Sequence, residues 1–409
     1  MTASSRTPKR RVLIIVENLP VPFDRRVWQE ATTLAQSGYQ VSVICPKGWG
    51  HERACETIDG IAIYRHPLPF EGKGVAGYLL EYGCALFWQF VLVWRVLVTR
   101  GFDVIHACNP PDLIFLVGGF FKLLFRKRFL FDHHDVNPEL YEVKFGRRDG
   151  FYRVLCALER WTFRTADVSI ATNDSFRQVA IARGKMAPEK VFVVRSGPKL
   201  SHLGDLPESP DLRAGRRYLV GYVGVMGPQD GLDYLLKAAH AVVRDHGRED
   251  VQFVLIGDGP SLSDIKELVN KLELQDYVHF TGYLGQREML AILKTTDVCV
   301  SPDEWNAMND KSTMNKVMEY MALGKAIVQF DLTEGRYSAQ EASLYAEHND
   351  PKDMAEKILA LIDDPDRRAR MGAFGRKRIE TALDWKFEAP QLLAAYDALW
   401  EDTEVKPRP

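Results

Sequence analysis

The chain has 409 residues, of which 46% are hydrophobic and 26% are charged. This composition is typical of a folded globular protein and excludes a disordered or low-complexity chain. The length exceeds what one hydrophobic core usually organises, so two domains are expected. The net charge of −2 hides an asymmetry, because residues 1–200 carry +9 and residues 201–409 carry −11. The basic half either reflects chance or meets something anionic, such as a membrane surface or a phosphorylated acceptor.

The cysteines and the N-terminus predict a cytoplasmic protein. The six cysteines lack CxxC and other metal-site spacings, and Cys45, Cys108 and Cys299 lie in apolar runs. Such residues are expected to be reduced, packed thiols. The opening MTASSRTPKRR leads directly into an apolar run without the longer apolar stretch of a signal peptide.

Short apolar runs alternate with longer amphipathic ones through the first half of the chain. Strands are expected in RRVLIIVEN, QVSVICP, DVIHACN, RFLFDHHD, DVSIATN and KVFVVRS. Helices are expected near residues 26–37, 76–99, 112–125, 150–165 and 174–184. Strands that are apolar on both faces and separated by helices indicate a parallel sheet covered on both sides. The first half therefore predicts a doubly wound α/β domain over residues 1–197.

A second domain of the same class is expected after a linker. The segment 197–217, GPKLSHLGDLPESPDLRAGRR, breaks the alternation with Pro, Gly and charge. Strands restart in RYLVGYVGV, VQFVLIGDG, YVHFTGYL, DVCVSPD, KAIVQFD and SLYAE, which places the second domain at residues 217–384. The last amphipathic stretch, about residues 385–409, is expected to pack back on the first domain. Ligands of such sheets bind beyond the carboxyl ends of the strands, so a site is expected in a cleft that the two domains face.

One long apolar segment, Tyr78–Val98, raises the question whether the chain crosses a membrane. Glu81, Gln89 and Arg95 interrupt the roughly 20 apolar residues that a membrane span requires. A buried or interfacial helix is therefore expected in place of a spanning one.

A basic run nearby, residues 118–129, interleaves aromatic side chains with Lys122, Arg126, Lys127 and Arg128. This combination suits anionic lipid head groups, which would place the protein peripherally on a membrane. It equally suits a helix end whose cations face the negative pole of the helix dipole. No RNA- or DNA-binding motif accompanies the run, so nucleic acid is not an expected partner.

Two stretches of the second half have the features of a phosphate-binding site. In GVMGPQDG, Gly224 and Gly227 follow a strand and open a helix, so backbone N–H groups could approach a diphosphate. Tight turns between strand and helix also use glycine for geometry alone. In NDKSTMNKVMEYMALGK (309–325), Ser312 or Thr313 is expected to cap a helix that ends at Ala322.

The polar face of this expected helix suits a nucleotide. Ser312, Asn315 and Glu319 share one face, whereas the buried stripe comprises Met314, Val317, Met318 and Met321. Free N–H groups and hydroxyls would meet a phosphate at the helix opening, and the deeper carboxylate could accept hydrogen bonds from both hydroxyls of a ribose. A capped helix with a solvated glutamate would show the same pattern.

The motifs taken together resemble a known family. The combination includes GDGP (257–260), VHFTGYL (278–284), DVCVSPD (297–303), EYMALGKAIV (319–328), FDHHDVNPELY and the head VENLPVPFDRRVWQEATTLAQSGYQVSVICPKG. Over nearly its whole length the chain resembles a retaining family-4 glycosyltransferase of the GT-B fold, in the branch found in bacterial surface-polysaccharide clusters. The resemblance implies transfer of a sugar from a nucleotide-diphosphate donor to a lipid-linked or glycan acceptor. No metal or other cofactor is implied, since the nucleotide sugar is a substrate.

The resemblance also implies roles for individual residues. Glu319 matches the glutamate that holds the donor ribose, and His134 matches the histidine near the transferred sugar. Tyr283 and Leu284 match a loop whose backbone reads the base. The remaining implied donor-site residues are Gly224, Gly227, Gly257, Asp310, Lys311, Ser312, Thr313, Met314 and Asn315.

On the acceptor side the expected residues are Asp24, Arg25, Arg26 and His133. The alternatives are a helix N-terminus capped by Asp24 and a packed or solvated ring for His133. A metal site made of Asp132, His133, His134 and Asp135 is conceivable, but successive loop residues seldom converge on one ion.

The chain departs from the family pattern in its charges. Lys311 stands where the family has a glutamate, and Val225 and Asp230 stand where an arginine and a lysine neutralise the diphosphate. Lys316 is expected to replace this countercharge, with Lys311 as second candidate. Alternatively, Lys316 only pairs with Glu319 on the helix surface. A catalytically silent scaffold of a polysaccharide-assembly complex, or a GT-B epimerase or phosphorylase, stays open because a fold does not fix a reaction.

Overall fold

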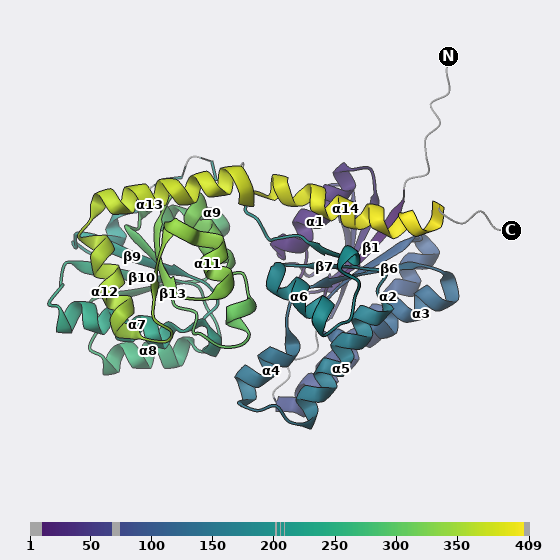
Figure 1. Ribbon diagram of the computed structural model, residues 1–409, viewed down its shortest axis with the longest axis horizontal. Coiled ribbons are helices and arrows are strands. Elements are labelled where there is room, and N and C mark those ends of the chain that lie inside the picture. Colours follow the sequence, from purple (N-terminus) through teal and green to yellow (C-terminus); the bar gives the residue numbers. More distant parts are fainter. Residues whose placement is uncertain (1–9, 68–73, 201–202, 205, 208, 405–409) are drawn as a thin grey trace, which may run out of the picture. The chain divides into compact units, whose positions relative to one another are not determined.

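The computed structural model describes residues 10–67, 74–200, 203–204, 206–207 and 209–404. They fall into two compact units, residues 1–195 with 389–409 and residues 196–388 (Figure 1). The expected linker 197–217 thus belongs to the second unit. The returning segment joins the first unit at Ala389.

The first unit is built on an eight-stranded sheet with the order β3-β4-β2-β1-β5-β6-β7-β8. All neighbouring strands pair in parallel except β3 and β4, which form an antiparallel hairpin at one edge. The strands are Arg11–Ile15 (β1), Gln40–Pro46 (β2), Cys55–Ile58 (β3), Ile61–His66 (β4), Val104–Cys108 (β5), Arg128–His133 (β6), Val168–Ala171 (β7) and Val191–Val193 (β8).

The edge hairpin was not predicted from the sequence, although a signal for it exists. Asp59 and Gly60 join the two strands, and both have positive φ angles of 50° and 82°. An Asp-Gly pair between two short runs is a strong hairpin signal, because this turn requires positive φ at both central residues. The first strand, Cys55–Ile58, is short and largely exposed, which masks it in a search for apolar runs.

Helices cover both faces of this sheet. They are Arg25–Gln36 (α1), Gly74–Thr99 (α2), Phe115–Phe125 (α3), Asn137–Phe145 (α4), Gly150–Thr165 (α5), Asp174–Ala182 (α6) and the larger part of Trp385–Glu404 (α14). Asp24, Asp149 and Asn173 cap α1, α5 and α6 through backbone N–H groups of the first turn. Within the described part of the chain, no helix combines the length and the apolar character that crossing a membrane would need.

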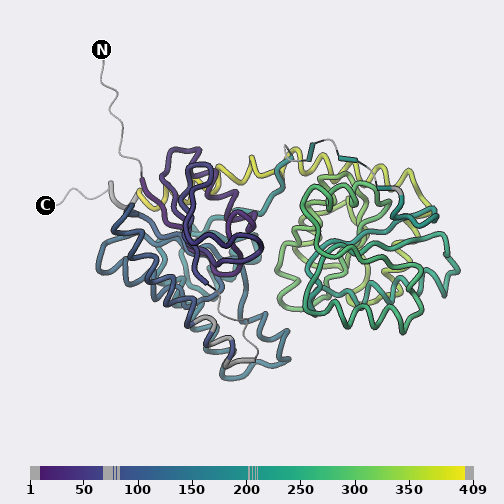
Figure 2. The backbone as a smooth tube through the Cα atoms, turned by 180° about the vertical axis from the view of Figure 1, so that it is seen from behind, coloured from purple at the N-terminus to yellow at the C-terminus, as the bar shows by residue number. Residues whose placement is uncertain are grey.

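The last helix packs beside the first strands of the chain (Figure 2). Leu392, Ala395, Tyr396 and Leu399 of α14 are buried, and their spacing of three and four residues places them on one helix face. The ring of Tyr396 meets Tyr39 edge to face at 5.4 Å. The guanidinium of Arg10 lies 4.3 Å from the ring centre of Trp400.

The second unit is a six-stranded sheet whose strands are all parallel, in the order β11-β10-β9-β12-β13-β14. This is the order of dinucleotide-binding folds, and it reverses direction between β9 and β12. The strands are Tyr218–Val223 (β9), Val251–Ile256 (β10), Val278–Gly282 (β11), Val298–Ser301 (β12), Ala326–Phe330 (β13) and Ser343–Ala346 (β14).

Two separate cores lie on the two faces of the second sheet. The helices are Leu232–His240 (α7), Leu262–Lys271 (α8), Gln286–Thr295 (α9), Asn315–Ala322 (α10), Thr333–Ala339 (α11), Pro351–Ile362 (α12) and Pro365–Arg378 (α13). One core contains the buried side chains of α7, α8 and α12, and the other those of α9 and α10. Figure 1 shows α7, α8 and α12 on one side of the strands and α9 and α11 on the other. The doubly wound α/β class predicted for both halves is confirmed.

Candidate active site

In each unit, several candidate residues follow a strand that borders the point where the strand order of its own sheet reverses. In the second unit this point lies between β9 and β12, and in the first between β1 and β5. Loops on the two sides of such a point diverge and leave a crevice at the carboxyl ends of the strands.

Glycines bring three loops of the second unit into backbone contact. A Cβ on Gly257 would lie 1.9 Å from the carbonyl oxygen of Gly224, and one on Gly231 would lie 1.9 Å from that of Pro302. Gly257 also has a φ of +136°, which side chains rarely tolerate. Only glycine therefore fits where the loops after β9, β10 and β12 meet. The N–H of Gly227 donates to Asp230 Oδ2 over 3.0 Å.

Helix α10 begins later than the sequence suggested. Its N-cap residue is Met314, so the expected cap by Ser312 or Thr313 is wrong. The hydroxyl of Ser312 donates to the Met308 carbonyl over 2.8 Å, which closes the short helical turn Asn309–Lys311. Because Met314 supplies no capping oxygen, the N-terminus of α10 keeps its attraction for an anion.

Lys311 and Asp310 hold the loop that precedes α10. Lys311 Nζ donates to the Ala307 carbonyl over 2.8 Å. Asp310 Oδ1 accepts from the Thr333 N–H over 2.9 Å, which joins this loop to the one after β13. Both side chains therefore support the loop, and their contacts with a donor remain predictions.

Lys316 is the central cation of the second unit's site. Its Nζ lies 2.7 Å from Asp303 Oδ1 and 3.8 Å from Asp230 Oδ1, and only 10% of its side chain is exposed. Its Cε is 3.4 Å from where a Cβ of Gly224 would stand, so the lysine lies against the glycine turn. The alternative in which Lys316 only pairs with Glu319 on the helix surface does not fit these contacts. Asp303 was missed in the sequence, although a carboxylate directly after a buried strand is a usable signal.

Burial governs the charge of the Asp230 carboxylate. It raises the pKa of Asp230 to about 6; nearby Asp303 also raises this pKa, while Lys316 lowers it. At position 230, where the family resemblance leads one to expect a lysine, the chain has this acid, and Lys316 of α10 supplies the cation beside it.

The other donor-side residues lie on neighbouring elements. Glu319 is buried one turn beyond Lys316 on α10. Tyr283 follows β11 and exposes its ring, whereas Leu284 packs against the core formed with α9 and α10.

In the first unit, strand alternation points the side chains of His133, the last residue of β6, and of His134, the next residue, to opposite faces of the sheet. His133 is fully buried, with its ring about 5 Å from those of Phe163 and Phe176 and its Nε2 3.5 Å from Glu159 Oε1. The packed-ring alternative describes His133, and an acceptor contact does not fit this position. Asp132 and His134 point to the opposite face.

Asp132 fixes the orientation of His134. The Nε2 of His134 lies 2.6 Å from Asp132 Oδ2, and the Arg26 guanidinium binds the same carboxylate with Nη2 at 2.9 Å and Nε at 3.3 Å. Burial alone would raise the pKa of Asp132, but Arg26 and His134 hold it well below its usual value. An ionised carboxylate only accepts hydrogen bonds, so the nitrogen of His134 that faces Asp132, Nε2, carries a proton.

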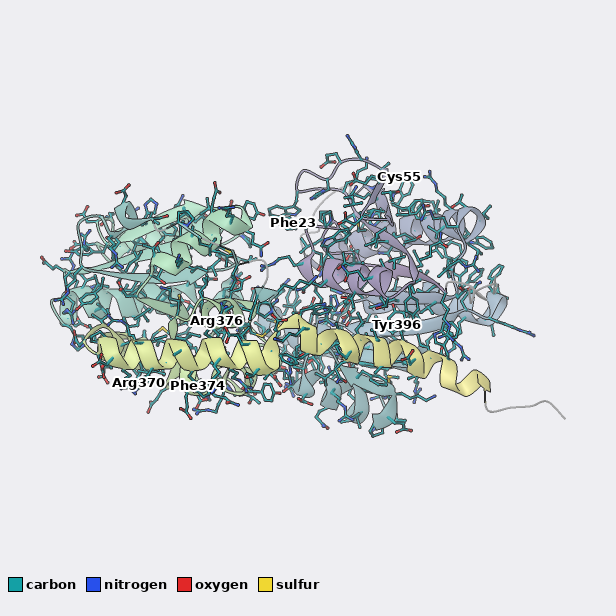
Figure 3. The ribbon with its side chains drawn as sticks, turned by 90° about the horizontal axis from the view of Figure 1, so that it is seen from above. Phe23, Cys55, Arg370, Phe374, Arg376 and Tyr396 are labelled. Carbon is teal, nitrogen blue, oxygen red and sulfur yellow. The ribbon has the colours of Figure 1, made fainter. Side chains whose placement is uncertain are left out.

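A wider buried network surrounds this carboxylate. Glu30 lies 3.2 Å from Arg26, and burial raises the pKa of Glu30 well above its usual value. His106 approaches Asp132 Oδ2 at 3.5 Å, and its Nδ1 lies 2.8 Å from the hydroxyl of Tyr396, which Figure 3 labels on α14. Burial lowers the pKa of His106, so this ring is neutral at pH 7. Arg26 is therefore a partner of Asp132 and His134 inside the unit, whereas Arg25 is exposed and Asp24 caps α1.

Potential metal ligands occur in this network, but Arg26 occupies its centre. Donor atoms of His106, Cys108 and Asp132, and likewise of Glu30, Asp132 and His134, lie within 4.8 Å of one another. Both oxygens of Asp132 already face the Arg26 guanidinium, which neutralises the carboxylate that a metal would need. The conceivable group of residues 132–135 does not converge, because His133 points away.

Comparison with known proteins identifies the family. Residues 24–197 match the model of the glycosyl transferase 4-like domain, and residues 217–364 match that of glycosyl transferases group 1. This chain belongs to the family-4 glycosyltransferases of the GT-B fold.

Individual relatives of this glycosyltransferase agree with the family match. It is 28% identical to alpha-maltose-1-phosphate synthase of Mycolicibacterium smegmatis over 69% of this chain and 76% of that protein. The fold resembles sucrose-phosphate synthase from Thermosynechococcus elongatus, with a TM-score of 0.79 and 20% identity over 96% of this chain and all of that one. It also resembles Anabaena HepE in complex with UDP and glucose, with a TM-score of 0.69 and 15% identity over 94% and 99% of the two chains. The chain is thus a glycosyltransferase of the GT-B fold.

The network around Asp132 predicts different effects of two adjacent arginines on stability. Arg26→Ala should lower the free energy of unfolding by about 3–5 kcal/mol, because it leaves buried Asp132 and Glu30 without their cation. Arg25→Ala should change it by less than about 0.5 kcal/mol, since Arg25 is exposed. Urea unfolding of both variants measures the difference. Equal effects would contradict the buried ion pair.

Asp230 predicts a pH dependence of stability. Its pKa is about 6 in the folded protein and about 3.9 in the unfolded chain, so the folded state binds this proton more tightly. The stabilising contribution is present below about pH 4 and is lost as the pH rises through 6.

The free energy of unfolding of the native enzyme, relative to Asp230→Asn, should fall by about 2 kcal/mol between about pH 4.5 and pH 7.5. Urea unfolding at both pH values measures it, with Asp233→Asn, at a half-exposed carboxylate, as control. A difference that does not change with pH would show that Asp230 is not the titrating group.

Proposed function

We propose that this glycosyltransferase moves a sugar, with retention at the anomeric carbon, from a nucleoside diphosphate sugar to a lipid-linked glycan acceptor. The reaction would take place at the cytoplasmic face of a membrane, in the synthesis of a surface polysaccharide. The position of Lys316 against the glycine turn of the second unit carries this proposal, because a leaving diphosphate needs a cation at such a turn.

The second unit supplies the groups that donor activation requires. The N-terminus of α10 attracts the phosphates through the N–H groups of its first turn and through its dipole. Lys316 lies one residue inside that terminus, and Glu319 follows it by one turn to hold the ribose. Asp303 and Asp230 keep the ammonium in place before the donor arrives. Leaving-group stabilisation then depends on groups that need no rearrangement.

The first unit supplies an oriented imidazole. With its Nε2 held by Asp132, His134 has Nδ1 left to meet a hydroxyl of the sugar or of the acceptor. The N–H of His134 donates to Asn109 Oδ1 over 2.7 Å, which fixes the backbone as well. This orientation supports a positioning role during transfer. No protein nucleophile is proposed.

A silent scaffold is the second candidate, and one observation favours it. Asp230 and Asp303 together outnumber the single Lys316, so the glycine turn carries more negative than positive charge when both acids are ionised. A diphosphate would meet that charge unless Asp230 is protonated, which a pKa of about 6 allows only in part at neutral pH.

Donor binding and nucleotide release distinguish the two candidates. A thermal-shift panel of UDP, GDP, ADP and dTDP sugars should identify one donor, which at 100 times its Kd adds about 2.7 kcal/mol of stability. Release of the nucleotide should then require a lipid-linked glycan acceptor. Donor binding without release under any condition would favour the scaffold. Release of product without an acceptor would favour an epimerase or a phosphorylase.

Substitutions of Glu319 and of His134 should affect different steps, namely donor binding and turnover. Glu319→Ala should weaken donor binding by about 1.5–3 kcal/mol, because it removes charged hydrogen bonds to the ribose. His134→Ala should lower turnover while the donor dissociation constant changes little. Calorimetric titration of the donor and initial-rate measurements separate the two effects. Donor binding that survives Glu319→Ala unchanged would remove the ribose assignment.

Lys316 should matter for turnover more than any other lysine of the site. Lys316→Ala should lower turnover by roughly 10²-fold or more, as the loss of one electrostatic stabiliser does elsewhere. Lys316→Arg should keep part of the rate, and Lys311→Ala should cost less, since Lys311 bonds its own loop. The double variant Lys316→Ala/Asp230→Lys, which returns a cation to position 230, controls for misfolding. Full activity in Lys316→Ala would refute the relocated charge.

We further propose that α2 and α3 of the first unit rest on an anionic membrane. Phe90 and Trp94 of α2 pack against Phe120, Phe121 and Phe125 of α3. Other apolar side chains of these helices remain exposed, namely Leu80, Phe87, Trp88, Val91, Val98, Leu116, Leu123 and Leu124. On α2 the spacing of these residues gives one continuous stripe, which is typical of a helix lying in a membrane interface.

The cations beside this stripe differ in their availability. Lys122 and Arg128 both pair with Asp167, at 2.9 and 3.8 Å. Arg126 and Lys127 follow the last turn of α3. Arg126 is exposed, whereas Lys127 is half-buried with Nζ 5.4 Å from the ring centre of Phe102. Arg126 is therefore the best candidate for a lipid phosphate, with Lys127 beside it.

Vesicle flotation tests the membrane surface. The enzyme should bind vesicles that contain phosphatidylglycerol, and added salt should release it, because screening acts over about 10 Å at 0.1 M. Arg126→Glu/Lys127→Glu should abolish binding, whereas Arg147→Glu/Arg148→Glu, on an equally exposed loop, should not. Binding that is indifferent to salt and to the first pair would leave these helices without a membrane role.

A further inference from the structure

An aromatic pair stands at the carboxyl ends of β1 and β2 in the first unit. The rings of Phe23 and Trp49 stack with centres 5.0 Å apart and planes inclined by 14°. Trp49 is 59% exposed, so Phe23 covers one face of the indole while much of the ring remains open to solvent. Figure 3 labels Phe23, which directly precedes the capping residue of α1.

The backbone around Trp49 is strained. Gly48, Trp49 and Gly50 all have positive φ angles, of 135°, 51° and 83°. Bulky residues seldom adopt such a conformation, and it persists only where the surroundings impose it. The His51 N–H closes this turn by donating to the Gly48 carbonyl over 2.8 Å. The indole in this strained turn lies on the surface, so packing of the hydrophobic core does not explain the strain.

A buried arginine joins the loop that carries Phe23 to the loop that carries Trp49. The side chain of Arg65 on β4 is fully buried, with Nη2 2.6 Å from the Val21 carbonyl and Nη1 3.1 Å from the Arg53 carbonyl. Val21 precedes Phe23, and Arg53 follows Trp49. The guanidinium thus links the two loops, and the stacked rings are held in place before any ligand binds.

The pair adjoins the network that orients His134. Arg26 lies three residues after Phe23, as the second residue of α1, and its guanidinium reaches both Asp132 and His134. Both rings lie at the edge of the sheet on which the candidate active-site residues of this unit stand. A ligand on Trp49 would therefore extend along the same edge as the reacting groups.

We propose that Phe23 and Trp49 form a platform on which a sugar ring of the acceptor stacks. The acceptor would then present a glycan to this enzyme and not a bare lipid phosphate. This assignment of the occupant rests on the proposed transferase function.

The size and the surroundings of the patch favour a sugar. Trp49 is the one large exposed apolar side chain among the described residues 16–24 and 46–54. A single indole matches the C–H face of one pyranose ring, whereas a protein partner needs a far larger apolar area. Polar residues flank the two rings in the sequence and could meet the sugar hydroxyls, namely Asp24, Arg25, Lys47, His51, Glu52 and Arg53.

Indole-resolved NMR tests the platform without any donor. The ¹⁵N-tryptophan-labelled protein is titrated with methyl α-D-glucoside, methyl α-D-mannoside, methyl β-D-galactoside and N-acetylglucosamine. At least one of these should shift the indole signal that disappears in Trp49→Phe. The signal of Trp161, which is 54% exposed and stacks on Phe115, should stay in place. A Trp49 signal that no sugar shifts, or that only phosphatidylglycerol bicelles shift, overturns the proposal.

Variants extend the test to function. Trp49→Ala should raise the dissociation constant of the shifting sugar and the acceptor KM about tenfold or more, with donor binding unchanged, while Trp49→Phe should keep most of both. Trp161→Ala is the matched control. If the Trp49→Ala enzyme still transfers sugar with an unchanged acceptor KM, the platform is refuted and the proposed transferase function is not. Absence of transfer in the native enzyme defeats the proposed function, and the NMR result then still decides whether Trp49 binds sugars.

Discussion

The hydroxyl of Tyr320 bridges two strands of the second unit at the point where they diverge beside the candidate donor site. It accepts a hydrogen bond from the Val223 N–H over 3.0 Å and donates to the Val300 carbonyl over 3.1 Å. These backbone groups belong to β9 and β12, which pair only through residues 220–221 and 298–299 before they diverge. Buried and unpaired, each group would cost about 1–3 kcal/mol. Because Tyr320 lies on α10, the same contact places Lys316 and Glu319 beside the divergence.

Each unit organises its candidate site around one largely buried cation and two carboxylates. Arg26 binds Asp132 and Glu30 in the first unit, and Lys316 binds Asp303 and Asp230 in the second. Buried ion pairs contribute little net stability, because desolvation offsets their attraction, but removing one partner is costly. Their effect here is positional. The flat guanidinium fixes a carboxylate that orients an imidazole, whereas the single ammonium of Lys316 is a point charge beside the glycine turn.

Much of this arrangement follows from local pattern. Apolar runs at strand spacing marked twelve of the strands, including β1 and β9, and the helical spacing through Met321 marked α10. The hairpin β3–β4 was missed because its first strand is mostly exposed. The start of α10 was misplaced, because Ser312 bonds backwards to Met308 and not forwards to a helix N–H. Serine makes both kinds of contact, and the choice depends on how the preceding loop folds.

The sequence by itself determined the doubly wound class and the glycine turns, since each depends on residues close together in the chain. Only the tertiary structure decided which charges meet. Arg26 and Asp132 are 106 residues apart, and they meet because β6 lies two strands from β1 in the sheet. It likewise decided that His133 is buried while His134 remains accessible. Local periodicity sets which residues share a face, but strand order sets what that face meets, and strand order is a property of the whole fold.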